Sequence, residues 1–226
     1  MRHPWRMVRA AYQVARTIRN PDRLEDILAL AGVFVPPEAL RRLTDTLWRI
    51  PSAAEALRER PRLGMVELHA LRTLPPDTLG RAFANHILNN RLDLNALPQL
   101  PARTDAEYVR AHLLEVHDIW HVLTGFGTHV AGEMGLQAFS LAQLGSPFAA
   151  GIVTGGMANT LLFAFSERDV RMRAIVRGWL LGKRAQPLFG AAWARMWERP
   201  LDEVRAAFGL DLPGVDALLP AVAQSC

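Results

Sequence analysis

The sequence TDAEYVRAHLLEVHDIWHVLTGFG, residues 104–127, decides the fold. Thr104 and Glu107 have the spacing of a capping box, which is typical of the first turn of an α-helix. Apolar residues then recur at helical intervals, and the Gly-Phe-Gly sequence at 125–127 is expected to break the helix. The stretch therefore predicts a long helix over residues 104–122, followed by a turn.

The rest of the chain carries the same helical signals. It is rich in Ala, Leu and Arg, and alternating β-branched runs are almost absent, so strands are hard to place. We expect an all-α fold, a single-domain helical bundle of about eight to ten helices. Beside residues 104–122, the periodicity predicts helices over 1–20, 21–31, 37–49, 53–60, 79–88, 132–144, 148–165, 167–181, 186–197 and 201–208, with a linker over 95–103.

Length and composition are those of one globular domain covering residues 1–226, since 50% of the residues are hydrophobic and 21% are charged. The formal net charge of +4 is uneven, because six arginines precede almost all of the acidic residues. Five of them lie within the helix predicted over residues 1–20, on the side opposite an apolar stripe, namely Arg2, Arg6, Arg9, Arg16 and Arg19. This basic amphipathic helix fits an anionic membrane surface, nucleic acid or simply solvent. No nucleic-acid motif is present, so we expect no nucleic-acid partner.

Cysteine usage indicates a reducing compartment. The only cysteine is Cys226, so neither an intrachain disulfide nor a thiolate metal site can form. Arginines interrupt every apolar stretch near the N-terminus, which argues against a secretory signal. We expect a cytoplasmic protein.

Residues 134–166 contain no charged side chain, and we expect them to be the most buried part of the molecule. The part from 148 to 165 is short for a membrane span and contains three glycines. Its small residues would allow close helix packing or leave room for a long apolar ligand. Leftover apolar faces on a small all-α domain also favour a homodimer.

The chemistry of the chain centres on His117, Asp118 and His121. On a helix these side chains lie within one arc of roughly 100°, with the two imidazoles one turn apart. Two histidines at this spacing, with a carboxylate between them, can share one cation without bending the backbone. The alternative is that the histidines only form hydrogen bonds inside the core.

Glu133 is the fourth candidate. It lies twelve residues after His121, at the start of the uncharged segment, and reaches the same cation only if the chain turns back after the glycines at 125 and 127. A set of His117, His121 and Glu133, with Asp118 as ligand or as orienting group, suits zinc first, with iron, manganese or cobalt as alternatives. His112 and His129 are expected to be bystanders.

The motif His117-Asp118-x-x-His121 followed by Glu133 resembles the signature of the coenzyme Q biosynthesis protein 4 family. The resemblance extends over roughly residues 50–210. It includes Glu59-Arg60-Pro61-Arg62-Leu63, Leu74-Pro75, Leu79-Gly80-Arg81, Tyr108, Glu115-Val116, Gly182-Lys183-Arg184-Ala185, Trp197-Glu198, Leu201, Arg205 and Phe208-Gly209-Leu210.

The resemblance implies a ubiquinone-biosynthesis protein that replaces the C1 carboxyl group of a polyprenylated benzoate-type precursor by hydroxyl. In that reaction one divalent metal would act as Lewis acid, while Asp118 or Glu133 would move a proton. The polyprenyl tail would lie along the uncharged helices. The basic helix over residues 1–20 would rest on the membrane surface, and other quinone-biosynthesis enzymes would be partners.

The chain departs from the family pattern at three positions. Gln137 and Ser140 stand where the family has a lysine and a glutamate, and His112 stands where an arginine is frequent. These changes remove charge from the expected ligand cavity.

The alternative function is a non-catalytic scaffold that binds the polyprenyl lipid and holds a structural metal. Four protein ligands would indicate the scaffold, and three ligands plus water would indicate the enzyme.

Overall fold

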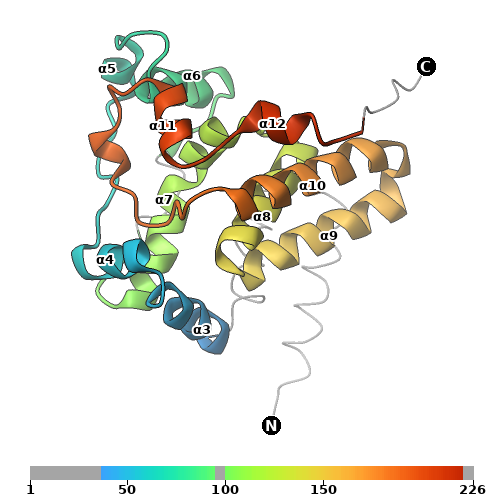
Figure 1. The fold of residues 1–226 in the computed structure, drawn as a ribbon, viewed down its shortest axis with the longest axis horizontal. Coiled ribbons are helices and arrows are strands. Elements are labelled where there is room, and N and C mark those ends of the chain that lie inside the picture. Colours follow the sequence, from blue (N-terminus) through green and yellow to red (C-terminus); the bar gives the residue numbers. More distant parts are fainter. Residues whose placement is uncertain (1–36, 95–99, 221–226) are drawn as a thin grey trace. The chain divides into compact units, whose positions relative to one another are not determined.

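The computed structural model describes residues 37–94 and 100–220, and Figure 1 shows the fold. The described residues form ten α-helices and no β-strand, so the predicted all-α fold with eight to ten helices is confirmed. The α-helices are α3 (Pro37–Leu47), α4 (Pro51–Glu59), α5 (Leu68–Arg72), α6 (Leu79–Asn89), α7 (Asp105–Thr124), α8 (Val130–Leu144), α9 (Pro147–Phe163), α10 (Arg168–Arg184), α11 (Leu201–Ala207) and α12 (Leu212–Asp216), and the short 3-10 helices are η2 (Phe165–Glu167) and η3 (Trp193–Arg195).

The chain folds into two compact units, and α7 belongs to the first of them. This unit comprises the described residues 41–94, 100–126 and 184–213. Within it, α6 and α4 pack against α7, and α5 and α11 pack against α6. Its core contains fully buried Phe83, Ile87, Ile119 and Trp193.

The second unit comprises the described residues 37–40, 127–183 and 214–220 and is built on α8, α9 and most of α10. α8 packs against α9. The close approach of α10 to α8 requires glycine, because a Cβ on Gly178 would lie 1.9 Å from the carbonyl oxygen of Gly135. Arg171 of α10 is buried and donates hydrogen bonds to Asn159 and Thr160 of α9.

Most of the predicted helix boundaries in the described residues agree with the structure. The helix predicted over 104–122 is α7, and the three helices that follow it lie within a few residues of their expected limits. The helix predicted over 186–197 is wrong: this stretch is irregular except for η3. The short helices α5 and α12 were not expected.

The uncharged segment 134–166 is only partly buried, contrary to expectation. Residues of α8 from Met134 to Phe139 are buried, but the last turn of α9 is exposed. Leu161, Leu162 and Phe163 have exposed fractions of 61%, 68% and 59%.

Several predictions fall outside the described residues, namely the helices over 1–20 and 21–31 and part of the linker over 95–103. The domain limits 1–226 also stay a prediction. Across residues 37–94 and 100–220, no helix has the length and apolar character needed to cross a bilayer.

Candidate metal centre

The N-terminus of α7 is fixed by the predicted capping box. The Thr104 hydroxyl accepts a hydrogen bond from the Glu107 N–H at 3.2 Å, and the Glu107 carboxylate accepts one from the Thr104 N–H at 3.2 Å. Asp105, in the same turn, accepts hydrogen bonds from Trp48 and Arg60. These contacts join α7 to the segment around α4, so the helix that carries the candidate ligands is held at its start.

The C-terminus of α7 ends as the sequence predicts. Gly125 adopts a left-handed conformation with φ of 72°, and its N–H donates to the His121 carbonyl. A left-handed residue at this position is typical of helix ends and favours glycine. The chain turns there, which brings the Phe126 carbonyl back toward the last turn of α7.

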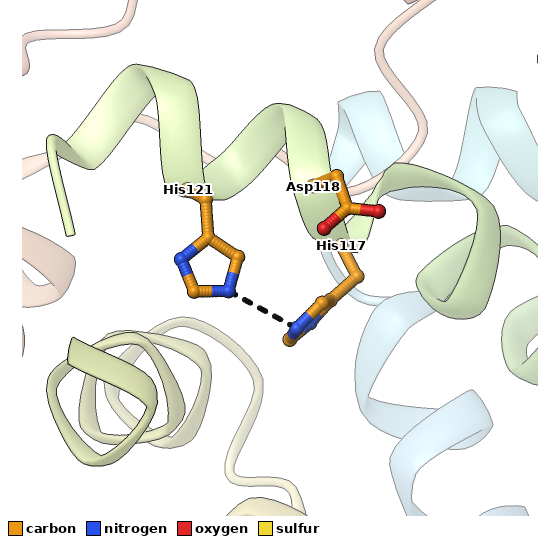
Figure 2. A group of neighbouring side chains, drawn as sticks. All are labelled: His117, Asp118 and His121. Carbon is orange, nitrogen blue, oxygen red and sulfur yellow. Dashed lines mark hydrogen bonds between the residues drawn. The ribbon is translucent and has the colours of Figure 1, made fainter. Parts of the chain in front are cut away.

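His117 and His121 form the centre of the candidate site (Figure 2). Their rings lie 4.8 Å apart at an angle of 85°, and their Nε2 atoms are 3.2 Å apart. One ligand atom from each of His117, Asp118 and His121 lies within 4.8 Å of the other two. His121 is buried, and the other two side chains are half-buried.

The Phe126 carbonyl sets the orientation and the tautomer of His121. His121 Nδ1 lies 3.1 Å from this oxygen. Because a carbonyl oxygen only accepts, Nδ1 carries the proton and Nε2 presents its lone pair toward His117. Such a hydrogen bond on the second ring nitrogen is a usual feature of metal-ligating histidines.

The distance between the two Nε2 atoms fits a shared metal ion. Two nitrogen ligands about 2.0 to 2.1 Å from a tetrahedral ion are about 3.3 Å apart, close to the 3.2 Å between His117 and His121. Imidazole nitrogen and carboxylate oxygen suit zinc, iron, manganese and cobalt. The cluster supplies three donors, so a four-coordinate ion bound by it has one position left for a further ligand.

A third histidine, His86 of α6, borders the cluster. Its Nε2 lies 3.6 Å from Asp118 Oδ1, and its ring stacks on that of His121 with centroids 5.4 Å apart. Among the described residues this buried Nε2 has no partner within hydrogen-bond distance. The sequence analysis missed His86, because it precedes the motif by thirty-one residues and only the packing of α6 against α7 brings it there.

The histidines keep Asp118 ionised. Burial raises the pKa of the Asp118 carboxyl, but the interactions with His86, His117 and His121 outweigh burial, so the pKa lies below its ordinary value. At neutral pH the site therefore offers a carboxylate that can bind a cation or accept a proton.

The remaining candidates lie elsewhere. Glu133 is a half-buried residue in the first turn of α8, in the second unit, and its part in the site stays a prediction. His129 precedes α8 and is exposed. His112 is buried and bonded to Gly190, away from the cluster. Gln137 is buried in α8.

Comparison with known proteins gives consistent matches over most of the chain. Residues 4–213 match the family model described as coenzyme Q (ubiquinone) biosynthesis protein Coq4. The mitochondrial ubiquinone biosynthesis protein COQ4 homolog of Danio rerio is 30% identical over 207 residues, which cover 89% of this chain and 74% of the relative. The Homo sapiens homolog is 29% identical over 210 residues, which cover 90% and 77%.

A solved structure shows the same fold. The crystal structure of a Nostoc punctiforme protein, provisionally described as a ubiquinone biosynthesis protein, is 25% identical and superposes with a TM-score of 0.79. The match covers 91% of this chain and 96% of the other.

Proposed function

The chain belongs to the coenzyme Q (ubiquinone) biosynthesis protein Coq4 family, and from this membership we propose that it performs a metal-dependent step on a polyprenylated benzoate-type quinone precursor. The step replaces the ring carboxyl group at C1 by hydroxyl and releases CO2. The observation that supports it is the 3.2 Å separation of the His117 and His121 Nε2 atoms, with the Asp118 carboxylate beside them.

The chain's own residues would hold the ion and move protons. A divalent ion would supply Lewis-acid polarisation of the substrate carboxylate or a phenolic oxygen. Replacing the carboxyl group by hydroxyl is a two-electron oxidation whichever ion is bound, so dioxygen or another two-electron oxidant would take the electrons, and dioxygen or water would supply the hydroxyl oxygen. His121 is held in the ligating tautomer by Phe126. Asp118, ionised at neutral pH, can ligate or accept a proton from the substrate hydroxyl. Glu133 is the proposed further ligand or second proton carrier.

A lipid-soluble substrate suggests a membrane surface as the place of reaction. The exposed end of α9 and η2 presents Leu161, Leu162, Phe163 and Phe165, each more than half exposed, and the Arg168 guanidinium lies 4.8 Å from the Phe165 ring centre. Apolar side chains next to arginine are suited to the interface of an anionic bilayer. We propose that this apolar tip, residues 161–165, touches the membrane together with the basic helix predicted over residues 1–20.

The second candidate is a lipid-binding scaffold that organises other quinone-biosynthesis enzymes. In this function the metal is structural and stabilises the scaffold itself. A structural ion stabilises a fold by joining separate segments. His117, Asp118 and His121 lie on one helix, so an ion bound by them alone joins nothing. The scaffold therefore requires a ligand from another segment, such as Glu133, and predicts that loss of the ion destabilises the fold.

Metal content, stability and turnover distinguish the two functions. Wild type, His117→Ala and His121→Ala are purified without added metal or chelator, with His69→Ala as control because His69 is an exposed histidine. If the protein is the enzyme, we expect about one equivalent of metal in the wild type and none in the two site variants. The variants should stay folded but should no longer release CO2 from a prenylated 4-hydroxybenzoate in lipid vesicles. Retained CO2 release without metal would contradict the proposal. A large loss of unfolding free energy would favour the scaffold.

A further inference from the structure

Arg205 of α11 binds the C-terminal end of α7, the helix that carries the candidate metal ligands. Its Nη2 donates to the Val122 carbonyl at 3.0 Å, and its Nε donates to the Leu123 carbonyl at 3.0 Å. The hydrogen bond from the Gly125 N–H to the His121 carbonyl ends the helical series of α7, so the carbonyls that follow have no donor within the helix. Arg205, which is distant in sequence, supplies the donors for two of them.

The segment that carries Arg205 is itself held by α6. The Leu79 N–H donates to the Arg199 carbonyl at 2.9 Å, and the Leu201 N–H donates to the Asp77 carbonyl at 2.8 Å. Helix α11 then packs against α6. Because α6, α7 and α11 all belong to the first unit, the guanidinium reaches the end of α7 from a support within the same compact body.

All three guanidinium nitrogens of Arg205 have a partner within the chain. Nη1 donates to the Asp202 carboxylate at 3.2 Å, three residues earlier, and the other two nitrogens bind the α7 carbonyls. Asp202 is 94% exposed, so this ion pair adds little stability. The planar fork of an arginine suits two neighbouring acceptors at once, whereas a lysine ammonium is a single point charge. The two carbonyls are therefore the contacts that define what Arg205 does.

These two carbonyls lie in the chain between His121 and the group that orients it. Phe126 follows His121 by five residues, and its carbonyl oxygen lies 3.1 Å from His121 Nδ1. A rotation of the backbone at Val122 or Leu123 would move that oxygen away from the ring. Since the partner of the second ring nitrogen fixes the tautomer and the orientation of a metal-ligating histidine, support of this short stretch of backbone reaches the ligand atom.

We propose that Arg205 is a positioning residue of the metal centre. By binding the Val122 and Leu123 carbonyls, it holds the Phe126 carbonyl on His121 Nδ1 and so keeps the lone pair of His121 Nε2 directed to the ion. Arg205 acts through the backbone of α7 and not by contact with the ion. Its effect on metal binding rests on the proposed function, whereas its effect on His121 is present in the metal-free protein as well.

NMR of the histidine ring nitrogens tests the effect on His121 in the full chain without metal. At about pH 8, above the usual pKa of histidine, the nitrogen shifts report which ring nitrogen carries the proton. The His121 signals are assigned by their loss in His121→Gln. Wild type should show the Nδ1–H form, and Arg205→Ala should show an increased share of the Nε2–H form.

The variant Arg205→Lys keeps the charge but not the fork. Its His121 tautomer should lie between those of wild type and Arg205→Ala, and it serves as the test if Arg205→Ala does not fold. An unchanged His121 tautomer in the folded Arg205 variants would overturn the proposal.

Chelator competition measures the consequence for metal binding. Arg205→Ala should raise the metal Kd on the order of tenfold, the lower end of the effect of groups that support metal-ligating histidines. Arg199→Ala removes an exposed arginine of the same segment and should match wild type. Val204→Ala shortens a fully buried side chain next to Arg205, so it should lower the unfolding free energy but leave the metal Kd and the His121 tautomer unchanged.

The outcomes separate this proposal from the proposed function. If Val204→Ala changed the His121 tautomer as much as Arg205→Ala, general loss of stability would explain both and the proposal would be wrong. A changed tautomer at an unchanged metal Kd would overturn Arg205 as a positioning residue of the metal centre. A wild type that binds no metal would contradict the proposed function, while a tautomer change confined to the Arg205 variants would still show that Arg205 orients His121.

Discussion

The backbone N–H of Gly190 donates a hydrogen bond of 3.0 Å to Nε2 of His112, a residue 78 positions earlier in the chain. Because an N–H can only donate, Nε2 is unprotonated and the neutral ring carries its proton on Nδ1. This nitrogen lies 3.3 Å from the Tyr108 hydroxyl, which lies 3.2 Å from the Pro61 carbonyl. This series of hydrogen bonds, from Gly190 through His112 and Tyr108 to Pro61, requires the buried His112 imidazole to be neutral.

We predict that His112 makes the fold sensitive to acid. Burial lowers the pKa of His112 to about 4, whereas an unfolded histidine titrates near 6.5. Between these values the unfolded chain binds the additional proton, so this contribution to stability is complete above pH 6.5 and is lost as the pH falls toward 4. The total is about 3 kcal/mol. Urea unfolding at several pH values should show a flatter profile for His112→Gln than for wild type, and parallel profiles would contradict the assignment.

Gly190→Ala should be strongly destabilising. Its φ of +82° disfavours a side chain, and a Cβ would lie 2.0 Å from the Cβ of Ala56 in α4. We expect a loss of about 3 kcal/mol of unfolding free energy or more. Gly64→Ala is the control, because Gly64 also has a positive φ, +71°, but nothing within 4 Å of the added Cβ, so only about 1 kcal/mol should be lost. Equal losses in urea unfolding would show that the contact with Ala56 is unimportant.

His86→Ala should weaken metal binding without removing a ligand of the cluster on α7. His86 stacks on His121 and lies 3.6 Å from Asp118, so its loss releases both side chains. Removal of such a supporting group typically costs 10- to 100-fold in metal affinity. Competition with a chelator measures the Kd, and His69→Ala should match wild type.

If His86→Ala changes the unfolding free energy but leaves the metal Kd unchanged, His86 contributes to packing and not to metal binding. His86→Asn, which keeps an N–H donor but not the ring, should recover part of the affinity if the contact with Asp118 matters more than the stacking.

The apolar tip should contribute to binding of anionic vesicles. The triple variant Leu162→Ser/Phe163→Ser/Phe165→Ser removes side chains that are 68%, 59% and 57% exposed, so the fold should tolerate it. We expect vesicle binding to fall on the order of tenfold in sedimentation with phosphatidylglycerol vesicles. Met65→Ser, at an 87% exposed apolar residue of the other unit, should have no effect.

Deletion of residues 1–20 should lower the same binding, since it removes the basic amphipathic segment. If both the deletion variant and the triple variant sediment with the vesicles as fully as the wild type, the proposed contact with a membrane surface is wrong.

The sequence predicted best what depends on neighbouring residues. The capping box of Thr104 and Glu107, the end of α7 at Gly125 and the approach of His117 to His121 follow from local backbone geometry. His86 could not be found in this way, because its position depends on how α6 packs against α7.

The wrong predictions also have physical reasons, because they concern structure that depends on more than the composition of neighbouring residues. Residues 186–197 have the composition of a helix, but Pro187 removes a backbone donor and Gly190 adopts a left-handed conformation that ends regular structure. Long-range bonds, such as that from Gly190 to His112, take the place of helical ones. The apolar end of α9 is exposed because hydrophobic composition does not state which surface will be covered, or by what.

The position of Lys183 gives the chain a single cleavage site for any protease that cuts only after lysine. That peptide bond lies in the last turn of α10, beside Trp179, and cannot enter a protease active site until the helix end unwinds. One cut would divide the 226 residues into two fragments, and its rate would report the opening of this single turn. The rate of that cut thus measures local unfolding next to the exposed Trp179.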